Sequence, residues 1–307
     1  MSKIVTIGGG TGSYRVLSGI KNIPDIFISA IVSMADDGGS TGRLRKELKV
    51  SPSGDVRQCL AALTPDQTMH DRMKKRIDTG EWAGHVVGNI FLAGLELITD
   101  SFAKGLEIAA KVLQIQGTVL PITLNNAELV VSLADGKIIE GESEIARTNL
   151  IPENIKNIYY KNPVKINDKA RQAILQADNI IFCPGNFYCS IVPNLIVEGF
   201  RQAITETNAT LIMIVNLENF KKHTDGWKVS DYVDELERYI GRPVDFILVN
   251  NEERKIENDL KEDKRVVESP LLSREPIVVN SADVIERSTV RHDPKKLAAV
   301  IGNIVSK

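Results

Sequence analysis

The sequence predicts an α/β domain built on a doubly wound, mostly parallel sheet. Short apolar runs recur along the chain, and amphipathic stretches of helical length lie between them. Continuous apolar runs are typical of strands that helices cover on both faces, and their alternation with helices indicates repeated βαβ units. The predicted strands are Ile4–Ile7, Ile26–Val32, Ile180–Cys183, Leu211–Val215, Phe246–Val249 and Ile277–Val279; the predicted helices include Lys169–Ala177, Asn194–Thr205, Asp231–Ile240 and Pro294–Val305.

The middle of the chain follows a different pattern. Glu128–Leu133 and Lys137–Glu140 flank Ala134-Asp135-Gly136, and Asp-Gly between two strand-like runs is typical of a hairpin turn. We therefore expect an antiparallel β-hairpin insertion near residues 118–166. The segment Asn251–Ser269 is charged and lacks an apolar period, which favours a solvated helix or a loop. Because no Pro/Ser-rich linker and no repeat occurs, we predict one domain over residues 1–307.

Composition and charge narrow the function classes. The chain carries 38 Lys and Arg against 40 Asp and Glu, a net charge of -2, so nucleic acid is not an expected partner. The three cysteines are odd in number and lack CxxC spacing, which argues against disulfides and a thiolate zinc site. The sequence shows no signal-peptide pattern and no run near the roughly 18 apolar residues of a membrane span, so we expect a cytoplasmic protein.

A candidate anion-binding turn follows the first predicted strand. It consists of Gly8, Gly9, Gly10, Thr11 and Gly12, and an apolar-periodic segment follows it. Glycines let the backbone approach a phosphate closely, and the amides of the next helix present the positive end of its dipole. We predict that this turn holds the phosphates of a nucleotide-type ligand. A glycine turn needed only to pack the strand against the helix is the structural alternative.

The spacing of this turn differs from two common nucleotide-binding loops. Ser13 stands where the third glycine of G-x-G-x-x-G, counted from Gly8, would lie. No Lys-Ser or Lys-Thr pair follows, as it would in a Walker loop. A dinucleotide-binding interpretation could use Asp36, about twenty residues further on, to hold a ribose. An NAD-dependent dehydrogenase is therefore kept as a third function hypothesis.

The second predicted strand leads into the segment DDGGSTGRLR, which is rich in charges and hydroxyls. The carboxyl ends of strands in an open α/β sheet converge on the ligand crevice, so this segment is expected to face the glycine turn. Asp36 and Asp37 could hold Mg²⁺ beside a phosphate or accept hydrogen bonds from ribose hydroxyls. An Asx-rich turn that caps a helix is the alternative. The predicted ligand contacts here are Asp36, Asp37, Ser40, Thr41 and Arg45.

Two later segments add candidates. Asp55 and Arg57 precede an apolar run, where Asp55 could act at the site or simply cap a helix. His85 and Asn89 lie in the segment GHVVGN, and His85 could donate a hydrogen bond to a ligand or be a structural histidine.

The loop after the strand Ile180–Cys183 has the same arrangement as the glycine turn, because it also joins a predicted strand to a predicted helix. Gly185, Asn186 and Ser190 offer hydrogen-bond donors before another helix, with a plain strand-to-helix connection as the alternative. Cys183 and Cys189 are interpreted as buried packing, because no histidine lies near Cys189 in the sequence.

The last candidate lies near the C-terminus, in the segment RHDP. Asp293 and Pro294 are typical of the cap and first residue of a helix, and Arg291 is expected to reach the ligand.

Taken together, these segments resemble the CofD/YvcK family over nearly the whole chain. The resemblance rests on Gly8–Gly12, residues 36–45, Gly54-Asp55-Val56-Arg57, Gly84-His85 with Gly88-Asn89, Pro184-Gly185 with Ser190, Pro193-Asn194, and Arg291-His292-Asp293. It implies a Rossmann-like domain and two functional branches. One comprises 2-phospho-L-lactate transferases, which use a guanosine-nucleotide-activated donor with Mg²⁺. The other comprises gluconeogenesis factors that bind UDP-sugars and support cell shape and envelope synthesis.

The DDGGSTGRLR and GHVVGN segments resemble the gluconeogenesis-factor branch more closely. However, Cys183-Pro184-Gly185-Asn186 stands where that branch usually has a Gly-Pro-Gly-Ser loop, and an Asn at the last position resembles the transferase branch. Residues 217–223 also depart from the family pattern, which puts ligand contacts there in doubt.

The first hypothesis is therefore a UDP-sugar-binding regulator without catalysis, which is compatible with a homo-oligomer. The alternative is a transferase in which Asp37 and Asp55 support Mg²⁺ while His85 and Asn186 position the acceptor.

Overall fold

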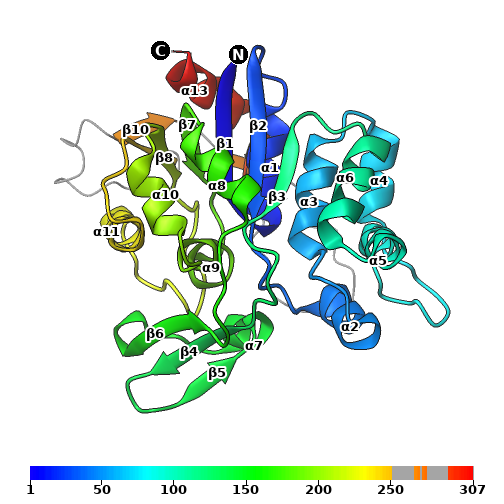
Figure 1. Cartoon of the computed structure of the whole chain (residues 1–307). Coiled ribbons are helices and arrows are strands. Elements are labelled where there is room, and N and C mark those ends of the chain that lie inside the picture. The colour runs from blue at the N-terminus through cyan, green and yellow to red at the C-terminus, as the bar shows by residue number, and fades with distance from the viewer. Residues whose placement is uncertain (251–265, 270–271, 275–289, 307) are drawn as a thin grey trace.

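A seven-stranded parallel sheet forms the centre of the protein. The structure, a computed structural model, describes residues 1–250, 266–269, 272–274 and 290–306 (Figure 1). The strand order is β10-β9-β8-β7-β1-β2-β3, and every neighbouring pair is parallel. The strands are β1 (Ser2–Gly8), β2 (Ile26–Val32), β3 (Thr118–Pro121), β7 (Asn179–Phe182), β8 (Thr210–Ile214), β9 (Phe246–Asn250) and β10 (Val266–Ser269).

This order confirms the predicted doubly wound α/β class. From β1 the chain moves outward through β2 and β3, then returns to β7 on the other side of β1 and continues outward again. That is the strand order of Rossmann-like domains, with the change of direction between β1 and β7. Most residues of β1, β2, β7, β8 and β9 are buried, which agrees with the continuous apolar runs in the sequence.

Helices cover both faces of the sheet. In Figure 1, α1 (Gly10–Ile20) lies behind β1, while α8 (Asp168–Leu175) and α10 (Phe200–Glu206) lie in front. The helix α13 (Pro294–Val305) packs against α1, and α11 (Val229–Ile240) against α10. Between β2 and β3 the chain forms a group of helices that flanks the sheet: α2 (Gly39–Leu48), α3 (Gly54–Leu63), α4 (Gln67–Lys74), α5 (Val87–Thr99) and α6 (Phe102–Val112).

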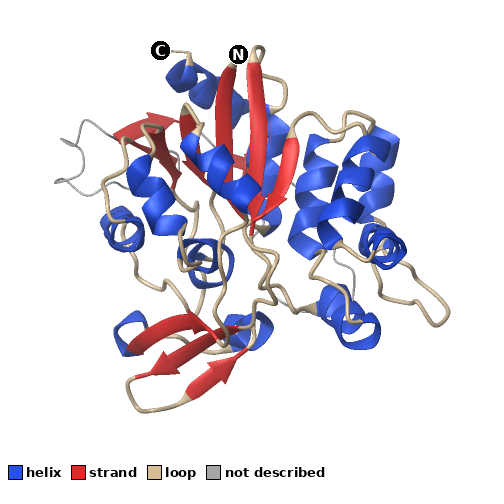
Figure 2. Cartoon of the chain, viewed as in Figure 1, coloured by secondary structure: helices blue, strands red, loops and turns tan. Residues whose placement is uncertain are grey.

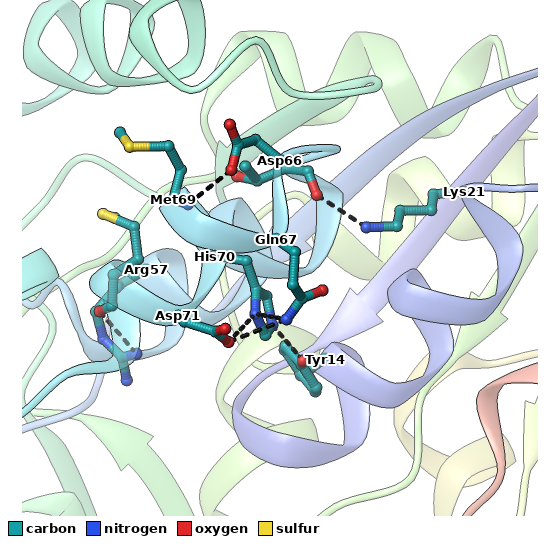
Figure 3. A network of polar contacts seen from close by, with 10 residues as sticks. Tyr14, Lys21, Arg57, Asp66, Gln67, Met69, His70 and Asp71 are labelled. Carbon is teal, nitrogen blue, oxygen red and sulfur yellow. Dashed lines mark hydrogen bonds and ion pairs between the residues drawn. The ribbon is translucent and has the colours of Figure 1, made fainter.

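A polar network that the sequence analysis did not anticipate joins α1 to α4. The hydroxyl of Tyr14 shares a hydrogen bond with His70 Nε2, and the other ring nitrogen lies 2.8 Å from a carboxylate oxygen of Asp71 and 3.0 Å from Nε2 of Gln67 (Figure 3). His70 is buried, so these bonds satisfy its ring. Lys21 adds a bond of 2.9 Å to the carbonyl oxygen of Thr64, near the start of α4.

The predicted insertion is a three-stranded antiparallel sheet at the carboxyl ends of the main strands (Figure 2). It consists of β4 (Leu129–Leu133), β5 (Ile138–Glu140) and β6 (Ile155–Tyr160) in the order β5-β4-β6, with α7 (Glu142–Arg147) and η1 (Pro152–Asn154). The predicted hairpin turn is present, and Gly136 has φ 89°. Residues 118–121, however, form β3 of the main sheet, so the antiparallel part begins after them.

Three sequence predictions differ from the structure or lie outside it. Residues 266–269 form β10 rather than a helix or loop, because they pair in parallel with β9, and this pairing is not visible in the charged local sequence. The predicted helix over 194–205 is two helices, α9 (Val192–Leu195) and α10, because Gly199 between them adopts φ 90°. Residues 251–265 and the predicted strand Ile277–Val279 lie outside the described residues.

The other predicted elements are observed within a few residues. Asp293 caps α13 by accepting hydrogen bonds from the amides of Lys295 (2.8 Å) and Lys296 (3.1 Å), as predicted. Cys183 and Cys189 are buried, which confirms that they pack in the core, and Cys59 is buried as well; all three are free thiols. Among the described residues, no helix is both long and apolar enough to cross a membrane.

Candidate functional site

The loops after β1 and β7 meet at the point where the strand order changes direction. These two strands are neighbours in the sheet, but the chain leaves them toward opposite sides. Open α/β sheets bind ligands outside the carboxyl ends of two such strands, and this region is called the crevice below. The approach of the two loops is close: a Cβ built on Gly12 would lie 1.6 Å from the carbonyl oxygen of Pro184. Glycine at this position is therefore required by packing. The predicted phosphate loops, Gly8–Gly12 and the segment containing Gly185, are thus brought together.

The glycine turn itself is in contact with Asp55. A Cβ on Gly9 would lie 2.1 Å from Oδ2 of Asp55, and the amide of Gly10 donates a hydrogen bond to the same carboxylate. Gly10 has φ 62°, a left-handed conformation that favours glycine. An amide predicted to bind phosphate therefore binds a carboxylate of the protein in this structure. Burial and the nearby charge of Asp36 raise the pKa of Asp55 to about 7.

Asp36 lies next to Asp55 at the end of β2. One oxygen of its carboxylate accepts the amide of Gly38 at 2.9 Å, and a Cβ on Gly54 would lie 2.1 Å from the other. The hydroxyl of Thr41 also donates to it. The Gly38 amide lies two residues after Asp36, so this bond forms an Asx turn. The sequence analysis gave such a turn as the alternative to a ligand contact. Burial raises the pKa of Asp36, so the ionised carboxylate is costly here.

Asp37 points to the inserted sheet rather than to the glycine turn. Its Oδ1 accepts a hydrogen bond of 2.8 Å from the amide of Ser143, in the first turn of α7. Beside it lies Glu142, a residue that the sequence analysis missed. Burial and the charges of Asp36, Asp55 and Asp37 raise the pKa of Glu142 to about 8. The crevice therefore gathers four carboxylates, one of which comes from a segment more than eighty residues away in sequence.

Two arginines oppose this negative charge. Nε of Arg57 donates to Oδ1 of Asn89 at 2.8 Å, and Asn89 in turn lies 3.4 Å from the hydroxyl of Thr41. Burial lowers the pKa of Arg57, while Asp55 and Asp36 raise it. Arg45 donates to the backbone oxygen of Asp36 at 2.9 Å and to Oδ1 of Asn126 at 3.0 Å. These predicted ligand residues thus form one connected network.

His85 contacts α2 instead of pointing to the carboxylates. Its Nδ1 lies 3.2 Å from the hydroxyl of Ser40, and the same hydroxyl accepts the amide of Val86 at 3.1 Å. The residue is buried, and burial lowers its pKa, so the ring is neutral near pH 7. The geometry is that of a histidine that fixes the chain before α5. A role in positioning an acceptor stays a prediction.

The loop after β7 is held by two residues that the sequence analysis did not select. The side chain of Asn216 accepts the amide of Gly185 and donates to its carbonyl oxygen, both at 2.8 Å. Nδ1 of His223 lies 2.9 Å from Oδ1 of Asn186, and its Nε2 lies 3.1 Å from the carbonyl oxygen of Ile145. His223 therefore links the loop to the inserted sheet. Ser190 ends a turn that begins at Asn186, because its amide donates to the carbonyl oxygen of Asn186 at 2.7 Å.

Arg291 reaches the same edge of the sheet from the C-terminal part of the chain. It lies in β12 (Val290–His292), which pairs antiparallel with β11 (Leu272–Arg274). The neighbouring His292 is buried beside Arg15 of α1 and the backbone of Val215, which directly follows β8. β12 is thus placed near the crevice. Whether Arg291 touches a ligand stays a prediction.

A cavity of about 630 Å³ adjoins the network next to Arg45 and Asn126. Apolar and polar groups line it, among them Met34, Phe102 and Leu124. Its volume lies in the range of small-molecule sites, roughly 300–1,000 Å³. The carboxylates themselves are not a preformed metal site: within the described ranges, no three His, Cys, Asp or Glu side chains are arranged to hold a metal ion.

Comparison with known proteins identifies relatives along the whole chain. The family model described as 2-phospho-L-lactate transferase CofD matches residues 4–290. A protein of Thermotoga maritima is 39% identical over 314 residues, which cover 98% of this chain and 99% of that protein. A protein of Halalkalibacterium halodurans named "Gluconeogenesis factor" is 39% identical and covers 81% of this chain and 77% of its own. A crystal structure of a UPF0052 family member from Bacillus halodurans has a TM-score of 0.86 at 32% identity, covering 98% and 99% of the two chains.

Proposed function

The chain belongs to the CofD family, and from this premise we propose that it is a gluconeogenesis factor that binds a UDP-sugar in the crevice between the loops after β1 and β7. In this role it would regulate carbon partitioning, cell shape and envelope synthesis without turnover of its ligand. The contact of Gly12 with Pro184 carries the proposal, because it joins the two predicted phosphate loops at the switch point of the sheet.

The position of Asp55 determines how a diphosphate would enter. An ionised carboxylate on the Gly9–Gly10 turn repels phosphate, so binding requires that Asp55 moves, is protonated or shares a cation with the phosphates. A Mg²⁺ ion that is bound to the nucleotide would be the cation that Asp55 shares with the phosphates. Mg²⁺ is commonly held by one or two carboxylates together with phosphate oxygens and water. Asp55 is one predicted ligand. Asp37, the other, uses Oδ1 to accept the Ser143 amide, so its Oδ2 would face the ion.

The rest of the ligand would extend toward the cavity beside Arg45. Arg45 has its guanidinium at the junction of that cavity and the carboxylate network, and its planar group is suited to phosphate or carbonyl oxygens. The mixed lining of the cavity is suited to a ring with polar edges, such as a nucleobase or a sugar.

Ligand-dependent thermal unfolding tests the proposal. A ligand at 100 times its dissociation constant stabilises a fold by about 2.7 kcal/mol. We expect UDP-N-acetylglucosamine with Mg²⁺ to raise the unfolding temperature, and GDP, GTP and NAD to leave it nearly unchanged. Stabilisation by NAD alone would overturn the proposal and favour a dehydrogenase.

A pair of variants on α2 places the ligand. Arg45→Ala removes a half-buried guanidinium of the network, whereas Lys46→Ala removes an exposed charge next to it on the same helix. Loss of a charged hydrogen bond should weaken UDP-sugar binding by about tenfold or more in Arg45→Ala, with less than about threefold change in Lys46→Ala. Equal losses in both variants would place the ligand elsewhere.

A CofD-like phospholactate transferase is the second candidate. The four carboxylates and the position of Asn186 beside His223 favour it, because such a reaction needs Mg²⁺ and an oriented acceptor. In that case GDP or GTP with Mg²⁺ would stabilise the fold, and Asp37→Asn should abolish Mg²⁺-dependent transfer. Unchanged transfer in Asp37→Asn would remove Asp37 from this mechanism.

A further inference from the structure

A second cavity of about 630 Å³ lies away from the crevice, between the inserted sheet and α11. Its walls are η1, β6, the segment 225–227 and the exposed face of α11, and η2 (Phe187–Ile191) forms one end. None of the residues assigned above to the nucleotide site lines this cavity. It therefore calls for a separate interpretation.

The lining combines negative charge with aromatic rings. Five carboxylates, from Glu153, Asp225, Asp231, Asp234 and Glu235, face two cations, Lys156 and Arg238, which leaves a formal charge of -3. Three aromatic side chains, Tyr188, Trp227 and Tyr239, lie among them. The chain's own Arg238 already places its guanidinium 4.3 Å from the ring centre of Tyr239, so a cation can be held against an aromatic face here.

Some of these carboxylates already bond to other groups of the protein, and others do not. Glu235 forms two bonds of 2.7 Å with Arg238, and Asp231 accepts the amide of Lys228 at 2.7 Å. Glu153 and Asp234 form no hydrogen bond or ion pair with any part of the chain that the structure describes. Two carboxylates on opposite walls thus remain available to a bound cation.

Tyr188 gives an independent indication of a ligand. The residue is only 2% exposed, yet its hydroxyl has no hydrogen-bond partner within the described ranges. Tyr188 lines the cavity together with Glu235, and burial and the nearby charge of Glu235 raise the pKa of Tyr188. The hydroxyl oxygen is not one of the fully enclosed unpaired atoms, so this otherwise buried side chain is open at its polar end to the cavity, where a ligand can bond to it.

We propose that this cavity binds a linear polyamine, a small molecule with two or more protonated amines joined by methylene chains. The ammonium groups would pair with Glu153 and Asp234, and one of them would donate to the hydroxyl of Tyr188. The methylenes would pack on Trp227 and Tyr239, as apolar stems of cationic side chains do on aromatic surfaces. A bare metal ion would use the carboxylates alone and leave the aromatic rings without a partner, and within the described ranges no three acidic side chains are arranged to hold one.

Calorimetric titration with spermidine, without nucleotide, tests this proposal. We expect saturable binding with one spermidine per chain at about 0.15 M salt, where weak surface pairing is screened. Mg²⁺ at matched ionic strength and 1,6-hexanediol should give no comparable saturable heat, because one lacks the methylenes and the other the charges. Absence of saturable spermidine binding would overturn the proposal, whatever the outcome of the UDP-sugar experiment.

Matched variants locate the site. The double variant Glu153→Gln/Asp234→Asn should weaken spermidine binding by about fivefold or more, and Tyr188→Phe, which removes only the hydroxyl, by about fivefold. Asp78→Asn/Glu81→Gln removes the same charge from exposed residues outside this cavity and should change the affinity less than twofold. Unfolding in urea shows whether each variant is folded. Equal weakening in the two double variants would show general charge attraction and overturn the assignment.

Discussion

Substituting Gly12 by alanine tests the close approach of the two loops at the switch point. The new Cβ would lie 1.6 Å from the carbonyl oxygen of Pro184 and 2.6 Å from its carbon, and both are backbone atoms. To restore an ordinary contact of 3.4–4 Å, the loops must separate by about 2 Å. Gly12 lies in α1 with a φ that alanine can adopt, so backbone strain does not contribute.

The magnitude follows from two opposing effects. Alanine in a helix is favoured over glycine by about 1 kcal/mol, whereas overpacking in a well-packed region typically costs about 1–3 kcal/mol, and more where only backbone can move. Because only backbone atoms can move here, the cost lies at or above the upper end of that range. After the helix gain is subtracted, we expect Gly12→Ala to lower the free energy of unfolding by about 2 kcal/mol or more, measured by urea denaturation. Gly94→Ala in α5 is the control, because a Cβ there meets no atom within 4 Å and should stabilise the fold by up to about 1 kcal/mol. If Gly12→Ala were as stable as Gly94→Ala, the loops would not be packed as described.

The remaining predictions concern stability. Because the pKa of Asp55 is raised to about 7, the folded chain keeps a proton that the unfolded chain releases near 3.8, so stability falls as pH rises between these values. Asp55→Asn should therefore raise the unfolding temperature more at pH 8 than at pH 5, and equal shifts would contradict the raised pKa. Tyr14→Phe should cost about 1 kcal/mol in urea denaturation, because it leaves Nε2 of His70 without its partner. Asp71→Asn, whose side chain is 66% exposed, should cost less than about 0.5 kcal/mol. The reverse order would refute this account of the α1–α4 contact. Asp293→Ala should cost about 0.5–2 kcal/mol by removing the cap of α13, and a change near zero would show that the cap is dispensable.

Local sequence patterns predicted most of the elements correctly. Continuous apolar runs identified β1, β2, β7, β8 and β9, and the Asp-Pro pair marked the start of α13. These signals work because burial on both faces of a strand and the capping of a helix depend on neighbouring residues in the chain. The same local logic placed Gly8–Gly12, Asp36 and Gly185 at strand ends, and therefore at one edge of the sheet.

The sequence by itself thus determined the class of the fold and the edge of the sheet at which the candidate site residues lie. Only the tertiary structure decided their partners: Asp55 lies on the glycine turn, Asp37 binds α7, and Glu142 joins the carboxylates. It also assigned Asn216 and His223 to the loop after β7. The physical reason is that these contacts join segments far apart in sequence. The segments that come into contact are determined by which strands are neighbours in the sheet and by where the inserted sheet packs. Neither can be predicted from the local period or spacing of residues in the sequence.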